Sequence, residues 1–254
     1  MNLKPLFLAL ALLTRIPLPA SVFSKPYSER DYQQSPLYYP LVGFALGLIL
    51  LGCALLLKPL FYAYLSAAVL LGLWVALSGA LHLDGLADCS DAYFAAHQHK
   101  NKAQLLAIMQ QPQLGAMAVI VLINCLLIKF ALLLELMLDN RSLLPLVVIC
   151  MLSRTAASFY IKRTPYARTA GIAQHLSDGQ YLGWLIAISM VCCVLGLWLS
   201  SLVFMLLYLP LAVVLLALWR HFWLKKIDGF TGDCVGALIE LSEILGLFIA
   251  IIAL

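Results

Sequence analysis

The chain has 254 residues, of which 64% are hydrophobic and only 11% carry a charge. Soluble globular domains carry about 25% charged residues, so this composition excludes a protein surrounded by water and indicates an integral membrane protein. The net charge is +4, and the basic residues lie at the ends of apolar runs, which indicates membrane topology rather than nucleic-acid binding.

The N-terminal segment combines Lys4 with an apolar run from Leu6 to Leu13, as a signal peptide does. Arg15 and the prolines that follow it interrupt the path from this run to a cleavage site, so we expect no cleavage. A bilayer crossing needs about 20 residues, and this run has about ten. The pattern therefore predicts a short interfacial or re-entrant helix.

Seven later apolar segments are long enough to cross a membrane as helices. We predict them at 39–57, 62–81, 115–138, 143–160, 181–199, 202–219 and 234–254. The sequence shows no internal repeat and no low-complexity tract. We therefore predict an all-α, polytopic membrane protein of about seven transmembrane helices plus the short N-terminal helix, with residues 1–254 forming a single domain.

Long polar segments at 15–38, 82–114, 161–180 and 220–233 alternate with short connections along the chain. The long segments hold eleven basic residues, namely Arg15, Lys25, Arg30, Lys100, Lys102, Lys162, Arg163, Arg168, Arg220, Lys225 and Lys226. The short connections hold only Lys58 and Arg141. Since Lys and Arg favour the cytoplasmic side, we predict that the long segments face the cytoplasm and that the C-terminus lies outside.

The densest cluster of acids is His82-Leu-Asp84-Gly85-Leu-Ala-Asp88-Cys-Ser-Asp91, directly after an apolar segment. On a helix the three aspartates fall within an arc of about 60°. Carboxylates so close together repel one another unless a cation lies between them, and their oxygens suit Mg²⁺. We predict that Asp84, Asp88 and Asp91 bind magnesium; the alternatives are a solvated acidic turn or helix capping by one aspartate. His82 is a candidate ligand, base or helix-end residue.

A second acidic motif, Thr231-Gly-Asp-Cys-Val-Gly-Ala-Leu-Ile-Glu-Leu-Ser-Glu243, opens the last apolar segment. Gly232 and Gly236 permit a close backbone approach by a ligand. Asp233 shares one helical stripe with Glu240 and Glu243, which lie deeper in the segment, where an unpaired carboxylate is costly. We predict that these acids take part in chemistry.

The alternative for Glu240 and Glu243 is a structural ion pair with Lys129 or Arg154, which also lie inside apolar segments. Topology does not explain Arg154, whereas it explains the basic loop that ends at Arg168. Arginine binds phosphate bidentately, so Arg154 and a magnesium site on one membrane face indicate phosphoryl or phosphodiester chemistry.

These motifs strongly resemble the cobalamin synthase family, the adenosylcobinamide-GDP ribazoletransferases. The similar segments follow one another over nearly the whole chain: Leu13-Thr-Arg-Ile-Pro-Leu-Pro19, Tyr39-Pro-Leu-Val-Gly43, the 82–88 run with Asp91, Ile108-Met109 with Leu114-Gly115, Ser153-Arg154, and the 231–243 motif with its two glutamates. The two acidic motifs together are highly specific.

The resemblance implies a magnesium-dependent transferase of vitamin B12 biosynthesis in the bacterial inner membrane, with its active site on the cytoplasmic face. It would join adenosylcobinamide-GDP to α-ribazole, or to α-ribazole 5′-phosphate, and release GMP. The ribazole 3′-hydroxyl would attack the phosphorus carried on the aminopropanol arm. The partners would then be these substrates and the lipid bilayer, with no nucleic acid; the sequence neither requires nor excludes a homo-oligomer.

The resemblance also assigns roles within the two motifs. Asp84, Asp88 and Asp91 would hold the Mg²⁺ that bridges the diphosphate, while Asp233, Glu240 or Glu243 would complete the metal shell or accept the proton. Positive charge would come from Arg154 and Arg15, and substrate contacts from His82, Gly232 and Gly236. Where the family usually has an Asp and an Arg before Leu-Gly, this chain has Gln111, Pro112 and Gln113, and the residue after Asp91 is Ala92 rather than the usual Gly. The 109–115 loop is therefore left out of the predicted site.

Two other function classes are compatible with acids in a membrane protein. CDP-alcohol phosphotransferases cluster aspartates at the cytoplasmic surface, but their pattern Asp-x-x-Asp-Gly-x-x-Ala-Arg fits poorly, because no Asp precedes Asp84 at that spacing and position 88 is Asp. A proton-coupled transporter that relays protons through Glu240 and Glu243 usually has repeat halves with broken helices. The sequence shows no such repeat.

Overall fold

The computed structural model describes residues 3–23, 26–96, 101–138, 142–169 and 171–253. In these ranges the regular structure is helical, and the only strand-like feature is an isolated bridge between Tyr166 and Phe230. The helices that correspond to the predicted membrane segments are α3 (Tyr39–Leu57), α4 (Ala63–Ser78), α7 (Ala116–Leu138), α8 (Pro145–Arg163), α9 (Leu182–Leu199), α10 (Leu202–Ile227) and α11 (Gly232–Ala253). The prediction of an all-α polytopic membrane protein is confirmed.

Six helices of the described chain are long and apolar enough to cross a bilayer, and a seventh crossing is obtained if α4 and α5 (Leu81–Ala96) are counted together. These two helices meet at a bend of 85°. The chain turns there through left-handed backbone at Gly79 and Ala80, with φ of 63° and 55°. Glycine at a helix end adopts this conformation without a steric penalty. The bend separates the first acidic motif, on α5, from the apolar helix that precedes it.

The remaining helices are short. The predicted N-terminal helix is present as α1 (Lys4–Leu13), whose ten residues are too few to cross a bilayer. The other short helical elements are η1 (Ala20–Phe23), α2 (Glu29–Gln34), η2 (Ser35–Tyr38), α6 (Lys102–Ile108) and η3 (Ile172–Leu176). They all belong to the long polar segments, apart from α1 itself.

The bundle is built around α8 and α11, the two most buried long helices. A close approach joins α3 to α8, because a Cβ at Gly43 would lie 2.2 Å from the Cys150 carbonyl oxygen and one at Gly47 2.5 Å from Val147 Cα. Small residues four apart let membrane helices pack this closely. In contrast, α9 and α10 expose most of their apolar side chains, as helices that face lipid do.

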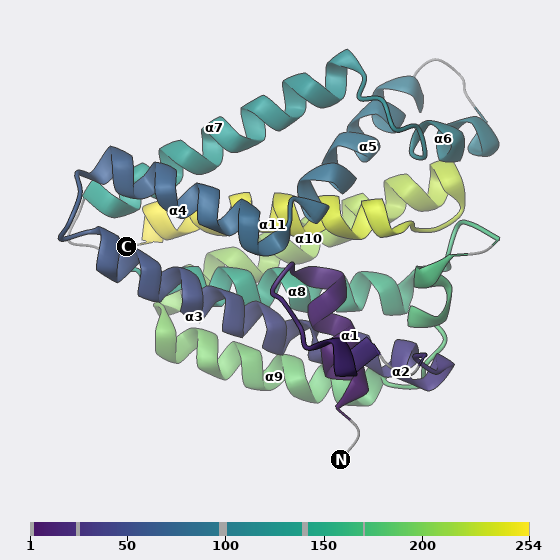
Figure 1. Ribbon diagram of the computed structural model, residues 1–254, viewed down its shortest axis with the longest axis horizontal. Coiled ribbons are helices and arrows are strands. Elements are labelled where there is room, and N and C mark those ends of the chain that lie inside the picture. The colour runs from purple at the N-terminus through teal and green to yellow at the C-terminus, as the bar shows by residue number, and fades with distance from the viewer. Residues whose placement is uncertain (1–2, 24–25, 97–100, 139–141, 170, 254) are drawn as a thin grey trace.

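The polar segments gather at one end of the bundle, on the right in Figure 1, and the short connections and the C-terminus lie at the other. This arrangement matches the predicted alternation of long and short loops. Lys58 directly follows α3, in the short connection between α3 and α4. Three of the basic residues counted from the sequence, Lys25, Lys100 and Arg141, lie outside the described residues.

Candidate active site

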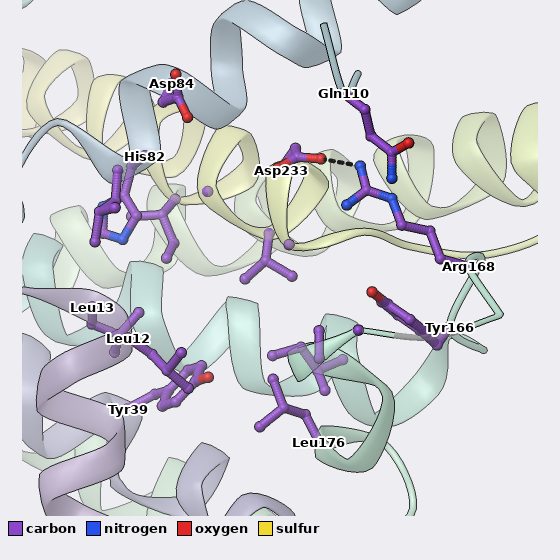
Figure 2. A pocket seen from close by; sticks show the side chains of 18 residues that line it. Leu12, Leu13, Tyr39, His82, Asp84, Gln110, Tyr166, Arg168, Leu176 and Asp233 are labelled. Atoms are coloured by element: carbon purple, nitrogen blue, oxygen red, sulfur yellow. Dashed lines mark hydrogen bonds and ion pairs between the residues drawn. The ribbon is translucent and has the colours of Figure 1, made fainter. Parts of the chain in front are cut away.

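A cavity of about 390 Å³ opens at the polar end of the bundle. Its walls come from α1, α3, α5, α8, α11 and the segments next to α6 and η3, so distant parts of the chain meet there (Figure 2). One side is apolar, with Leu12, Leu13 and Leu176. The polar lining consists of His82, Asp84, Gln110, Tyr166, Arg168 and Asp233, with the Tyr39 hydroxyl. A ligand with both an apolar body and an anionic group fits such a lining.

The two acidic motifs meet at this cavity because α5 packs closely on α11. A Cβ at Gly85 would lie 2.6 Å from the Asp233 carbonyl oxygen, so only glycine permits this approach. On α5, Asp84 is exposed and Asp88 is half-buried. The carboxylate of Asp88 interacts electrostatically with Asp233, Asp84 and Asp91 as well as with Arg168. The structure thus brings Asp84, Asp88 and Asp233 into one negatively charged group.

Asp91 caps a helix, a role that the sequence analysis gave only as an alternative to metal binding. Its two carboxylate oxygens accept hydrogen bonds from the backbone N–H of Gly115, at 2.6 Å, and of Ala118, at 3.0 Å. These N–H groups open α7, so Asp91 caps that helix, where a negative charge is favourable. A Cβ at Gly115 would lie 2.5 Å from the Asp91 Oδ1 atom. Magnesium binding by Asp91 stays a prediction, and capping already occupies both of its oxygens.

No three His, Cys, Asp or Glu side chains within the described ranges lie close enough together to hold a metal ion without further ligands. Magnesium rarely needs such a cage, because enzymes of phosphate chemistry usually hold it with one or two carboxylates, water and the phosphates of the substrate. Asp84 fits this requirement because it is exposed and lines the cavity. Asp88 does not line the cavity, but it is half-buried on the same helix and interacts electrostatically with Asp84 and Asp233.

Arg168 faces these acids across the cavity. Its NH2 group donates a hydrogen bond to the Oδ2 atom of Asp233 at 2.8 Å, and Thr231 Oγ1 donates to the same oxygen at 3.1 Å. The neighbouring Tyr166 also lines the cavity. Burial raises the pKa of the Tyr166 phenol, with Arg168 opposing the shift, so Tyr166 stays protonated at neutral pH.

His82 is buried in the cavity wall, with 3% of its surface exposed. Neither ring nitrogen has a hydrogen-bond partner in the part of the chain that the structure describes. Buried polar atoms normally have a partner, and a hydroxyl or phosphate of a ligand in the cavity would supply one. This geometry agrees with the predicted substrate contact of His82.

Of the other residues predicted to contact the substrate, Gly232 and Gly236 line the cavity and Arg15 does not. Gly232 lines the cavity, and a Cβ there would meet nothing within 4 Å, so the space beside it is open to a ligand. Gly236 lines the cavity too, but a Cβ there would lie 3.1 Å from His82 Cα, so this glycine also serves helix packing. Arg15 does not line the cavity, and its side chain packs against Gly79.

The deeper acids of the last helix form an ion-pair network in the centre of the bundle. Lys129 Nζ lies 2.5 Å from both Glu240 Oε2 and Glu243 Oε2, and Arg154 NH1 contacts Glu243 Oε1. The four side chains are at most 4% exposed and do not line the cavity. The network holds two positive and two negative charges. The geometry favours the structural alternative, and the chemical roles predicted for Glu240, Glu243 and Arg154 stay predictions.

Three polar residues of the cavity were not singled out from the sequence: Gln110, Tyr166 and Arg168. Gln110 belongs to the 109–115 loop, which supplies no charge, as expected, but does contribute this amide to the lining. Arg168 was attributed to membrane topology. No local sequence signal distinguishes it from Lys162 or Arg163, because its place at the cavity depends on contacts with a distant segment.

Comparison with known proteins identifies a family and several named relatives. The family model described as cobalamin-5-phosphate synthase matches residues 5–251. The chain is 39% identical to the adenosylcobinamide-GDP ribazoletransferase of Pseudomonas aeruginosa PAO1 over 248 residues, 95% of each chain. It is 38% identical to the protein of the same name from Pseudomonas fluorescens Pf0-1, over 94% of this chain and 95% of the relative. A third such protein, from Stutzerimonas stutzeri A1501, is 40% identical over 94% of each chain. No solved structure matches at a significant level.

Proposed function

The chain belongs to the cobalamin-5-phosphate synthase family, and we infer that its cavity is the active site of an adenosylcobinamide-GDP ribazoletransferase. The enzyme joins adenosylcobinamide-GDP to α-ribazole, or to its 5′-phosphate, in the synthesis of cobalamin. One structural observation supports this assignment most strongly: two acidic motifs some 150 residues apart meet at a cavity whose described lining includes one arginine.

The reaction breaks the phosphoanhydride bond of the diphosphate and forms a phosphate ester bond to ribazole. The 3′-hydroxyl oxygen of ribazole bonds to the phosphorus on the aminopropanol arm, the bond from that phosphorus to the bridging oxygen breaks, and GMP leaves. The hydroxyl proton passes to a base. Such reactions need mainly the alignment of two groups and the neutralisation of phosphate charge. The apolar and charged sides of the cavity suit these two tasks.

Magnesium, when bound, would neutralise the diphosphate and stabilise the leaving phosphate. Asp84 and Asp88 are the residues that would hold it, since Asp84 lines the cavity and Asp88 interacts electrostatically with Asp84 and Asp233. Of the three acids predicted to complete the metal shell or accept the proton, only Asp233 lines the cavity. His82 and Tyr166 would orient the substrates through hydrogen bonds.

We place the enzyme in the bacterial inner membrane with the cavity facing the cytoplasm. The support is the gathering of the basic segments at the cavity end, because Lys and Arg favour the cytoplasmic side. Adenosylcobinamide-GDP and ribazole would then enter from the cytoplasm, while the apolar surfaces of α9 and α10 contact lipid.

The transporter alternative receives little support from the geometry. Glu240 and Glu243 are paired with Lys129 and Arg154, so neither carboxylate is an isolated proton carrier. The α4–α5 bend is the one broken pair of spanning helices found within the described residues, and paired transporter halves would need a counterpart.

Release of GMP tests the function directly. The purified protein, reconstituted in liposomes with Mg²⁺, should convert adenosylcobinamide-GDP and α-ribazole to adenosylcobalamin and GMP in a 1:1 ratio. Omission of ribazole should stop GMP release. The assignment fails if no GMP appears, or if GMP appears without ribazole. Uptake of adenosylcobinamide-GDP into the liposomes without GMP release would indicate a transporter instead.

A further inference from the structure

The ion pair between Arg168 and Asp233 lies at the polar end of the cavity. Among the described residues that line the cavity, Arg168 is the only lysine or arginine. The two side chains are 22% and 23% exposed, and Figure 2 shows the guanidinium between the Asp233 carboxylate and Gln110. A diphosphate that enters the cavity therefore meets one cation, and that cation already contacts an acid.

The contact with Asp233 uses only part of the hydrogen-bonding capacity of Arg168. Its NH2 group donates one hydrogen bond to one carboxylate oxygen, and its buried Nε has no partner within the described chain. A guanidinium has five N–H donors in a fork that matches two oxygens of a phosphate. A partly exposed ion pair with one hydrogen bond adds less stability than a buried, bidentate pair. A phosphate that engages two N–H groups would therefore displace the carboxylate.

The backbone around Arg168 is held in place, although it lies outside regular helix. The Ala167 N–H donates to the Phe230 carbonyl oxygen at 2.9 Å, and the Phe230 N–H donates to the Pro165 carbonyl oxygen at 2.9 Å. A Cβ at Gly229 would lie 2.2 Å from that Pro165 oxygen, so this contact requires glycine. These bonds tie the arginine segment to the connection that leads into α11 and Asp233. The arginine is thus positioned before any ligand arrives.

Removal of the arginine would leave Asp233 among like charges. Its neutral partner Thr231 would remain, but its charged neighbours would then include Asp84 and Asp88. Three neighbouring carboxylates without a basic partner favour a cation. The same displacement that frees Arg168 from its acid would therefore complete a cation site.

We propose that the diphosphate of the substrate displaces Asp233 from Arg168, and that the released Asp233 carboxylate joins Asp84 and Asp88 around Mg²⁺. The proposal rests on the transferase function inferred above and names the residue that recognises its nucleotide. The diphosphate, by binding Arg168, releases Asp233 for Mg²⁺, and Mg²⁺, by binding Asp233, releases Arg168 for the diphosphate. Binding of diphosphate and of divalent cation is therefore positively coupled, and thermodynamic linkage makes the coupling reciprocal.

Binding to the purified full-length protein in detergent tests the exchange, with GDP as the diphosphate probe and Mn²⁺, followed by electron paramagnetic resonance, in place of Mg²⁺. Arg168→Gln should weaken GDP binding by about 10- to 100-fold. It should also tighten Mn²⁺ binding in the absence of GDP, because Asp233 is free. Arg163→Gln removes an exposed cation at the same end of the bundle but outside the cavity. Screening by solvent should keep its effects below about twofold.

Asp233→Asn should change both affinities in the direction opposite to Arg168→Gln. GDP should bind several-fold more tightly without metal, because Asp233 no longer competes for Arg168. Mn²⁺ should bind less tightly, because one carboxylate is lost. The matched control is Asp84→Asn, which removes the same charge from the cavity without touching Arg168. If both variants tighten metal-free GDP binding equally, cavity charge alone explains the effect and the exchange is wrong. The exchange is also wrong if Arg168→Gln behaves like Arg163→Gln.

The results that would refute the exchange between Arg168 and Asp233 differ from those that would refute the transferase function. The unmodified enzyme that releases GMP with ribazole, but gives either contrary result with the variants, would refute the exchange alone. An unmodified enzyme that releases no GMP would refute the proposed transferase activity, whatever the variants bind.

Discussion

The chain places acids and bases together in two regions, and the regions differ in charge balance and in exposure. In the centre of the bundle, Lys129 and Arg154 face Glu240 and Glu243, and each carboxylate has a basic partner with almost no exposed surface. At the cavity, Asp84, Asp233 and the neighbouring Asp88 have one basic partner among the described lining residues, Arg168, and all three acids remain partly accessible.

Charge balance and exposure together distinguish structural ion pairs from ligand-binding groups in this protein. A balanced, dehydrated set of ion pairs needs no ligand, and it locks α7, α8 and α11 together. An unbalanced, accessible set needs a cation and offers a place for it. We therefore assign chemistry to the cavity and stability to the network, although the network also contains residues of the second acidic motif, Glu240 and Glu243.

The largest expected effect is on turnover at the cavity. Asp84→Asn should lower the rate of GMP release by about 10³-fold, since it removes a carboxylate expected to hold Mg²⁺. The free energy of unfolding should change by less than about 0.5 kcal/mol, because Asp84 is exposed. A GMP-release assay measures the first effect, and thermal unfolding in detergent measures the second.

The control for that variant is Asp228→Asn, at an exposed acid of the same end of the bundle, whose left-handed φ of 58° asparagine tolerates. It should keep normal turnover. Near-normal activity of Asp84→Asn with Mg²⁺ would show that the metal assignment is wrong.

Stability should respond most at the ion-pair network. Glu243→Gln should lower the free energy of unfolding by about 3–5 kcal/mol, because it leaves Arg154 and Lys129 without one buried partner. Thermal unfolding in detergent would report the loss. The double variant Arg154→Met/Glu243→Met should recover part of the stability, since apolar side chains replace both charges. A fully stable but inactive Glu243→Gln protein would instead place Glu243 in the chemistry.

The distance between α5 and α11, which carry the two acidic motifs, should affect both stability and turnover. Gly85→Ala would place a Cβ 2.6 Å from the Asp233 carbonyl oxygen and push α5 away from α11. Such overpacking costs about 1–3 kcal/mol, and turnover should fall because Asp84 moves relative to Asp233. The matched control is Gly72→Ala on α4, where a Cβ meets nothing within 4 Å. If both variants behave alike, the close α5–α11 contact does not set the geometry of the site.

The smallest effect should come from the exposed ion pair between Lys102 and Asp228, at 3.1 Å, whose side chains are 42% and 74% exposed. Lys102→Met should change the free energy of unfolding by less than about 1 kcal/mol, because solvent screens the pair. The result is read from the same thermal unfolding experiment. A loss as large as that of Glu243→Gln would mean that exposure does not separate the two classes of charge.

Much of the fold followed from the sequence, because long apolar runs and the distribution of Lys and Arg determine where helices cross and where loops gather. The bend between α4 and α5 did not follow, since it depends on left-handed backbone at Gly79 and Ala80. Two left-handed residues leave no periodic signal in an apolar run.

The site was predictable where its residues are close in sequence, and less so where they are not. The acids of α5 and α11 stood out as two local motifs. The capping of α7 by Asp91 depends on a residue 24 positions away, and the pairing of Lys129 with Glu240 on one 111 positions away. The sequence offered both only as alternatives, and we predicted metal binding for Asp91 and chemical roles for the glutamates instead. Arg168 was attributed to membrane topology, because its place at the cavity depends on the hydrogen bonds between its segment and the distant Phe230.

The most direct test compares turnover per folded molecule in two variants that each neutralise one carboxylate, Asp88→Asn at the cavity and Glu240→Gln in the network. GMP release with Mg²⁺ and ribazole is divided by the fraction of protein that unfolds cooperatively in detergent. Asp88→Asn should lose about 10²-fold or more of the turnover, whereas folded Glu240→Gln should stay within about threefold of the unmodified enzyme. Equal losses in the two folded variants, or a loss confined to Glu240→Gln, would contradict the assignment of chemistry to the cavity.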